Sequence, residues 1–248
     1  PKTAFPGGCH AWKTWQEAVI LLAILALAVG LRAYRIGEES VWWDEYTSLV
    51  HLDADSIWRF LNLNRTLDPA TMPLYYSLEY LWWHYVNGTV TGLRWLSVLI
   101  GIAAAPLLYA LGRRLFGPTG GAVASLLYAL SPIHVFHAQG IRMYVLLVTL
   151  AIASAYTFAG LVEDGRLRWW VAHGAANALL FWTHPFALLL PAAQGLFLLL
   201  FRRRQWDTVG AWGILQAGLL LPPVMYLSEV RFWPTEQTAD WMKLPSVG

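Results

Sequence analysis

The sequence predicts an all-α polytopic membrane protein with about seven transmembrane helices. Hydrophobic residues make up 57% of the 248 residues and charged residues only 13%, whereas a soluble domain carries roughly 25% charged residues. The apolar residues form runs of about 17–22, long enough to cross roughly 30 Å of hydrocarbon as helices. So few charges cannot cover a water-facing surface, and a soluble fold is therefore excluded.

The predicted spans are separated mostly by Gly, Pro and Arg. They cover residues 16–35, 93–112, 121–137, 141–162, 168–183, 185–201 and 208–227. In the first run, Ala26-Leu27-Ala28 resembles a signal-peptidase site. The apolar stretch continues to about Tyr34, however, which favours an uncleaved first helix.

Three basic clusters orient these spans. They are Arg113-Arg114, Arg166 and Arg202–Arg204. Cytoplasmic loops carry an excess of Lys and Arg, so we expect all three clusters in the cytoplasm. We then expect a cytoplasmic segment at 1–15, a membrane module at 16–227 with an outer loop at 36–92, and an outer segment at 228–248 that is truncated.

The outer loop is predicted to hold two short helices that lie on the membrane. The segment Met72–Val86 is apolar, but it is only about 15 residues long and contains Glu79 and His84. Its four Tyr and two Trp suit the headgroup zone, which favours an interfacial helix over an eighth span. The other helix starts near Ile57, after capping residues at 53–56.

The acidic pair Asp44-Glu45 follows the first span and two tryptophans. Carboxylates at a membrane boundary are costly unless they are solvated or used. A general base must be a carboxylate or an imidazole within reach of the acceptor, and Asp44 suits that role. The competing interpretation is a solvated acidic pair beside an aromatic belt.

Two arginines are candidates for binding a phosphate. Arg142 lies at the outer end of the fourth span and Arg94 at the start of the second, and guanidinium groups bind phosphate in bidentate fashion. Gln139 and Tyr144 flank Arg142 and can add hydrogen bonds. Alternatively, each arginine only extends from a helix end to the interface.

Histidines offer a further anion or metal site. His184 lies in a sharp outer turn, Thr183-His184-Pro185, where it can pair with a phosphate or bind a metal. His134 and His137 share a helix face, which is weak evidence for a metal. The single cysteine, Cys9, excludes an internal disulfide and a cysteine metal cage. The net charge of +2 gives no indication of nucleic acid.

The polar candidates share one side of the membrane in this topology. Each of these residues is a weak indication alone, but an active site requires several polar side chains close together at one water-facing surface. The residues concerned are Asp44, Glu45, Met72, Arg94, Gln139, Arg142 and His184.

The order of these motifs resembles the GT-C superfamily of membrane glycosyltransferases, which take sugars from polyprenyl- or dolichyl-phosphate donors. It is most similar to the branch with protein O-mannosyltransferases and lipid A aminoarabinose transferases. The matching stretches are Asp44-Glu45, Met72-Pro73-Leu74-Tyr75-Tyr76, Leu93-Arg94-Trp95-Leu96-Ser97, Gln139-Gly140-Ile141-Arg142-Met143-Tyr144 and Thr183-His184, within residues 20–200.

The resemblance implies an inverting transfer of sugar at the extracytoplasmic face of a bacterial inner or plasma membrane. It implies that Asp44 and Glu45 are catalytic, with Asp44 as base or acceptor-orienting group. Substrate contacts would come from Tyr75, Tyr76, Arg94, Gln139, Arg142, Tyr144 and His184. The implied partners are a polyprenyl-phosphate sugar, membrane lipids and other membrane subunits. No cofactor is certain, although some relatives suggest a divalent metal.

Two positions depart from the pattern of this superfamily. Met72 stands where Lys or His is usual, and Gly140 stands where Glu is common. These departures motivate an alternative, in which the chain is a catalytically degenerate subunit that binds lipid or supports a membrane complex. A transporter is disfavoured, because transporters often contain repeats and place polar groups near the bilayer midplane.

Overall fold

The computed structural model describes residues 13–67, 72–202 and 206–228, and the regular secondary structure in these ranges is helical. Four described helices are long and apolar enough to cross a membrane: α1 (Thr14–Ala33), α5 (Val90–Leu130), α7 (Tyr144–Asp164) and α10 (Trp206–Ser228). The prediction of an all-α membrane protein is therefore confirmed.

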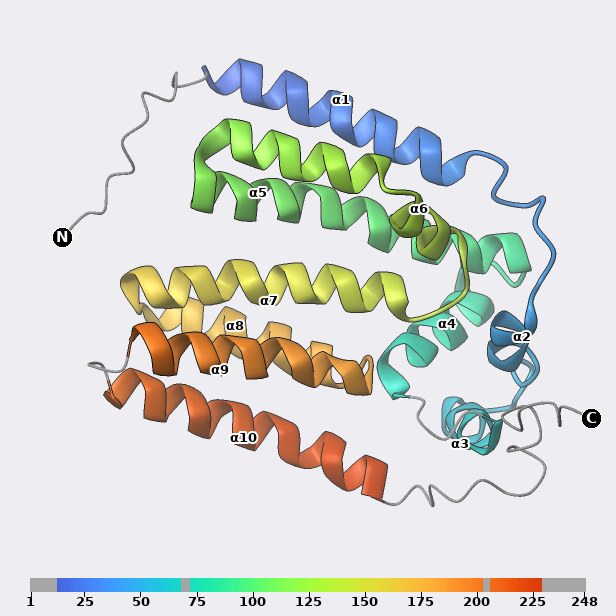
Figure 1. Ribbon diagram of the computed structural model, residues 1–248. Coiled ribbons are helices and arrows are strands. Elements are labelled where there is room, and N and C mark those ends of the chain that lie inside the picture. The colour runs from blue at the N-terminus through green and yellow to red at the C-terminus, as the bar shows by residue number, and fades with distance from the viewer. Residues whose placement is uncertain (1–12, 68–71, 203–205, 229–248) are drawn as a thin grey trace, which may run out of the picture.

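Two predicted spans form shorter helices. The segment 168–183 becomes α8 (Leu167–Phe181), and 185–201 becomes a 3₁₀ turn, η1 (Pro185–Leu188), followed by α9 (Leu189–Phe201). The bundle is built by packing α1 on α5, α5 on α7, α7 on α8 and α8 on α10 (Figure 1). The count of seven spans stays a prediction.

Helix α5 turns back on itself at Gly117. This glycine has φ +81°, in a region that L residues avoid and glycine tolerates. The arms 90–116 and 118–130 run antiparallel (Figure 1), and they hold the second and third predicted spans. At Gly112, an added Cβ would lie only 2.9 Å from the Cα of Gly121, so glycines permit the close approach of the arms.

The third predicted span, 121–137, is wrong at its end. The second arm of α5 stops at Leu130, and a separate short helix, α6 (Pro132–Gln139), begins after Ser131. Proline lacks an N–H group and its ring clashes with the preceding helical turn, so Pro132 starts a new helix and does not continue the old one. His134 and His137 therefore lie on α6.

The loop predicted to lie outside, residues 36–92, holds three described helices where two were predicted. The expected helices are α3 (Ile57–Leu67) and α4 (Pro73–Tyr85), and the additional one is α2 (Trp43–Leu49). Ser56 accepts a hydrogen bond from the amide of Arg59 at 3.3 Å, and Pro73 occupies the first turn of α4. A helix of seven residues is too short to show a clear helical period, which explains why α2 was missed.

Helices α2, α3, α4 and α6 gather at one end of the bundle, here named the α2–α4 end (Figure 1). The turns at Gly117 and between α7 and α8 lie at the opposite end. There Arg114 pairs with Glu163, with Nη2 and Oε2 2.7 Å apart. The predicted basic clusters at Arg113-Arg114 and at Arg166 thus lie at the same end of the bundle, and the acidic pair Asp44-Glu45 lies at the other end.

Candidate active site at the α2–α4 end

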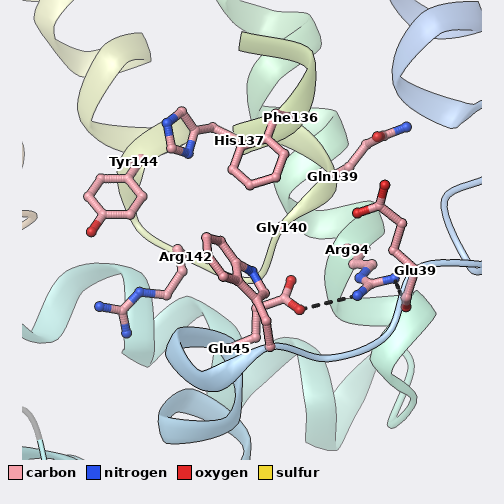
Figure 2. A pocket seen from close by; sticks show the side chains of 10 residues that line it. Glu39, Glu45, Arg94, Phe136, His137, Gln139, Gly140, Arg142 and Tyr144 are labelled. Carbon is pink, nitrogen blue, oxygen red and sulfur yellow. Dashed lines mark hydrogen bonds and ion pairs between the residues drawn. The ribbon is translucent and has the colours of Figure 1, made fainter. Parts of the chain in front are cut away.

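A charged pocket opens between α2, α5, α6 and the start of α7 (Figure 2). Its cavity volume is about 30 Å³. Its lining combines two carboxylates, two guanidinium groups and an aromatic wall. The residues are Glu39, Trp42, Glu45, Arg94, Phe136, His137, Gln139, Gly140, Arg142 and Tyr144.

Glu45 joins three parts of the chain at the base of this pocket. It lies in the first turn of α2 and is 1% exposed. Its Oε2 accepts from Nη2 of Arg94 at 3.2 Å, and its Oε1 accepts from the backbone N–H of Ile141 at 3.0 Å. Both carboxylate oxygens are engaged, so Glu45 is suited to hold the pocket together and not to abstract a proton.

Arg94 fastens the linker between α1 and α2 to the start of α5. Its Nη1 donates to the carbonyls of Ile36 at 3.1 Å and Glu39 at 2.9 Å, and its Nη2 also reaches the carbonyl of Ser40 at 3.4 Å. The side chain is 3% exposed. The charge of this buried arginine is therefore met by Glu45 and by three carbonyl oxygens.

Arg142 extends from the loop between α6 and α7 toward α2 and α4. Its Nη1 donates to the hydroxyl of Tyr76 at 2.9 Å, to the carbonyl of Asp44 at 3.2 Å and to Oγ1 of Thr47 at 3.3 Å. It lines the pocket although it is 8% exposed (Figure 2). These hydrogen bonds fix the position of the guanidinium group, which can then bind an anion.

Asp44 is half-buried beside the pocket and not in its lining. Its backbone oxygen holds Arg142, while its carboxylate makes no hydrogen bond within the described residues. The two neighbouring acids therefore differ in their hydrogen bonding. Both carboxylate oxygens of Glu45 accept hydrogen bonds, whereas the carboxylate of Asp44 accepts none from the described residues.

Three other predicted site residues carry structural contacts. Gln139 donates to the last carbonyls of α1, including that of Tyr34 at 2.8 Å, and thereby caps that helix. Tyr75 is fully buried, with its hydroxyl 2.8 Å from that of Ser97 and its ring against Tyr76. Tyr76 is the member of this group that reaches Arg142.

An aromatic row forms one wall of the pocket and continues beyond it. The ring centroids of Trp42 and Phe136 lie 5.6 Å apart, those of Phe136 and His137 5.4 Å, and those of His137 and Tyr144 5.0 Å (Figure 2). Tyr144 in turn lies 5.9 Å from His184. Burial lowers the pKa of His137, so its imidazole is neutral at neutral pH.

His184 stands apart from the charged pocket. Its Nδ1 accepts from the amide of Phe186 at 3.0 Å, which caps η1. It also lines an apolar groove together with the buried Met72. His184 contacts the lining of the charged pocket through the ring of Tyr144.

No group of three or more metal-binding side chains occurs in the described part of the chain. His134 and His137 are a pair without a third ligand there. The described residues therefore offer no ligand set for the divalent metal that the resemblance suggests.

Three residues at or near the site were not among the predicted site residues. Glu39 lies in the linker before α2, Phe136 belongs to a segment predicted to span the membrane, and Glu79 is buried on α4. Their proximity arises from packing between distant segments, which a single helical period does not encode.

The fold and the pocket define a class: an all-helical membrane protein with a charged site at one end of its bundle. The chain belongs to the dolichyl-phosphate-mannose-protein mannosyltransferase family, whose model matches residues 78–226, more than half of the chain. Membership of this family makes the chain a glycosyltransferase of the general GT-C type. The acidic pair lies before the matched region. A search of curated proteins found no match.

Proposed function

We propose that the protein transfers a sugar from a polyprenyl-phosphate donor to an acceptor at the extracytoplasmic face of the membrane. Family membership supports the reaction class. The observation that carries the proposal is that Arg142 lines a pocket beside the Glu45–Arg94 pair, with Asp44 as its direct neighbour. This set combines an anion-binding group with a carboxylate that has no hydrogen bond in the described structure.

The donor phosphate would lie against Arg142. The guanidinium is anchored by Tyr76 and by α2, so little side-chain freedom is lost when an anion binds. Tyr144 lines the same pocket and can donate a hydrogen bond. The aromatic wall of Trp42 and Phe136 offers an apolar face to a sugar ring.

In the proposed step, the bond between the anomeric carbon and the phosphate oxygen breaks, and its electron pair stays on the phosphate. The acceptor oxygen bonds to the anomeric carbon from the opposite side, which inverts that centre. Asp44 takes the proton of the acceptor. Arg142 stabilises the charge that develops on the leaving polyprenyl phosphate.

The extracytoplasmic orientation is supported by charge. The α2–α4 end lies opposite the turns that contain Arg114 and Arg166 (Figure 1). Under the positive-inside rule those turns face the cytoplasm, and the pocket faces the other side.

The substitution Asp44→Asn tests the role of the base. We expect sugar transfer to fall by about 10²–10⁴-fold, the usual contribution of a general base. Purified protein in lipid nanodiscs would receive labelled dolichyl-phosphate mannose and a membrane extract, and release of dolichyl phosphate would be measured. Asp55→Asn, at an exposed carboxylate that pairs with Arg59, is the matched control.

Undiminished transfer by the Asp44→Asn variant would contradict this assignment. The alternative function is a lipid-binding subunit without turnover, which Met72 and Gly140 favour because both lack the polar groups that the resemblance leads us to expect. No turnover by the wild type, together with saturable binding of dolichyl phosphate, would support that alternative.

A further inference from the structure

Glu79 is a buried acid that the proposed reaction does not use. It lies on α4 and is 0% exposed, and neither carboxylate oxygen has a hydrogen-bond partner in the described structure. An ionised carboxylate without hydrogen bonds is very costly to bury, and such a group takes up a proton instead. Burial accordingly raises the pKa of Glu79 well above its ordinary value.

The position of Glu79 connects it to the candidate site. It follows Tyr76 by three residues and Tyr75 by four, so the three side chains share a face of α4. Tyr76 accepts the 2.9 Å hydrogen bond from Arg142. Glu79 therefore lies one helical turn from the group that positions this arginine.

The charged and titratable groups around Glu79 come from three segments. Arg142, in the loop between α6 and α7, favours its ionised form, whereas Glu45 on α2 disfavours it. Tyr75, on the same helix, also interacts with Glu79. Glu45 is itself paired with Arg94 of α5. Desolvation exceeds these charge effects, which favours the neutral acid.

We propose that Glu79 is held as a neutral carboxylic acid beside the arginine of the site, and that its ionisation at alkaline pH weakens binding of a phosphate-bearing lipid. The second half rests on the proposed function. Ionisation adds one negative charge near Arg142 in a poorly hydrated region, where charges interact more strongly than in water. That charge repels a bound phosphate and competes with it for the guanidinium.

Infrared spectroscopy tests the protonation state without any substrate. A protonated carboxylic acid has a C=O stretching band that a carboxylate lacks. We expect this band in the wild type at neutral pH, its loss at alkaline pH, and its absence from Glu79→Gln. The control Glu38→Gln, at an exposed glutamate paired with Arg35, should retain it. A spectrum that Glu79→Gln leaves unchanged would overturn the proposal.

Binding of polyprenyl phosphate tests the coupling to the site. Between neutral and alkaline pH we expect affinity for the wild type to fall about tenfold more than affinity for Glu79→Gln, because glutamine has the shape of the neutral acid and cannot ionise. Equal pH dependence of the two proteins would overturn the coupling. Glu38→Gln should follow the wild type.

The two assays separate failure of this inference from failure of the proposed function. If the wild type binds no polyprenyl phosphate at any pH, the proposed function and the coupling are both wrong, while the infrared band still decides the protonation state. If the lipid binds and turns over but Glu79→Gln keeps the pH dependence of the wild type, only the coupling is wrong.

Discussion

At the scale of single residues, adjacent acids have opposite environments. Both carboxylate oxygens of Glu45 accept hydrogen bonds, from Arg94 and from the amide of Ile141, whereas the carboxylate of the half-buried Asp44 has no hydrogen bond in the described structure. Neighbouring residues of a helix point in directions about 100° apart, so one side chain faces the protein interior and the next faces its edge. The difference in role follows from that rotation.

Removing the carboxylate of Glu45 should destabilise the protein strongly. In Glu45→Ala, Arg94 stays buried without its ionic partner, and breaking one side of a buried pair costs about 3–5 kcal/mol. Thermal unfolding in detergent micelles measures this. Glu38→Ala breaks an exposed pair with Arg35 and should cost less than about 1 kcal/mol. Equal losses in the two variants would contradict the structural role of Glu45.

At the scale of elements, the hairpin of α5 depends on glycine where its arms meet. An added Cβ at Gly121 would lie 2.6 Å from the carbonyl oxygen of Tyr109, which is backbone and cannot move aside cheaply. The hydroxyl of Ser125 also donates across the hairpin to Ala105 at 2.9 Å. These contacts hold together two arms that the sequence separates by the turn at Gly117.

The substitution Gly121→Ala should therefore lower stability, by about 1–3 kcal/mol as is typical of overpacking. Gly213→Ala on α10 is the matched control, because an added Cβ there meets nothing within 4 Å. Alanine favours helix over glycine, so the control should raise stability by up to about 1 kcal/mol. A melting temperature unchanged by Gly121→Ala would show that the arms are less closely packed than described.

At the scale of the whole molecule, a buried polar network links α7, α8, α9 and α10. Trp212 donates to Nε2 of His173 at 3.0 Å, and Asn177 contacts that same nitrogen and donates to Gln216 at 2.8 Å. Ser154 bonds to Asn177 and accepts from Gln194 at 3.1 Å. In lipid there is no hydrophobic driving force between apolar helix faces, so such hydrogen bonds help to hold α7, α8, α9 and α10 together.

Replacing the centre of this network should loosen that half of the bundle. Asn177→Leu removes one hydrogen bond from Ser154 and one from Gln216, and we expect a loss of about 1–3 kcal/mol in unfolding measurements. Asn62→Leu, at an exposed position of α3, should change stability by less than about 0.5 kcal/mol. Similar effects at the two positions would contradict a stabilising network.

The class of the molecule and much of its helical plan follow from composition and from local patterns in the sequence. The starts of the helices near Ile57 and Met72 and the break between residues 112 and 121 are local properties of the chain, and the structure agrees with them, although the third predicted span ends early at Leu130. The order of motifs also pointed to Arg94 and Arg142, which the structure brings into one pocket. Their chemical roles stay predictions.

The contacts between the residues of the site depend on the packing of distant segments, which the structure shows. It pairs Glu45 with Arg94 across 49 positions and with Ile141 across 96, ends the third span at Leu130, and buries Glu79 close to the site. Periodicity reports which face of one helix is apolar. It does not report which distant donor meets a given carboxylate, because that depends on how several helices pack together.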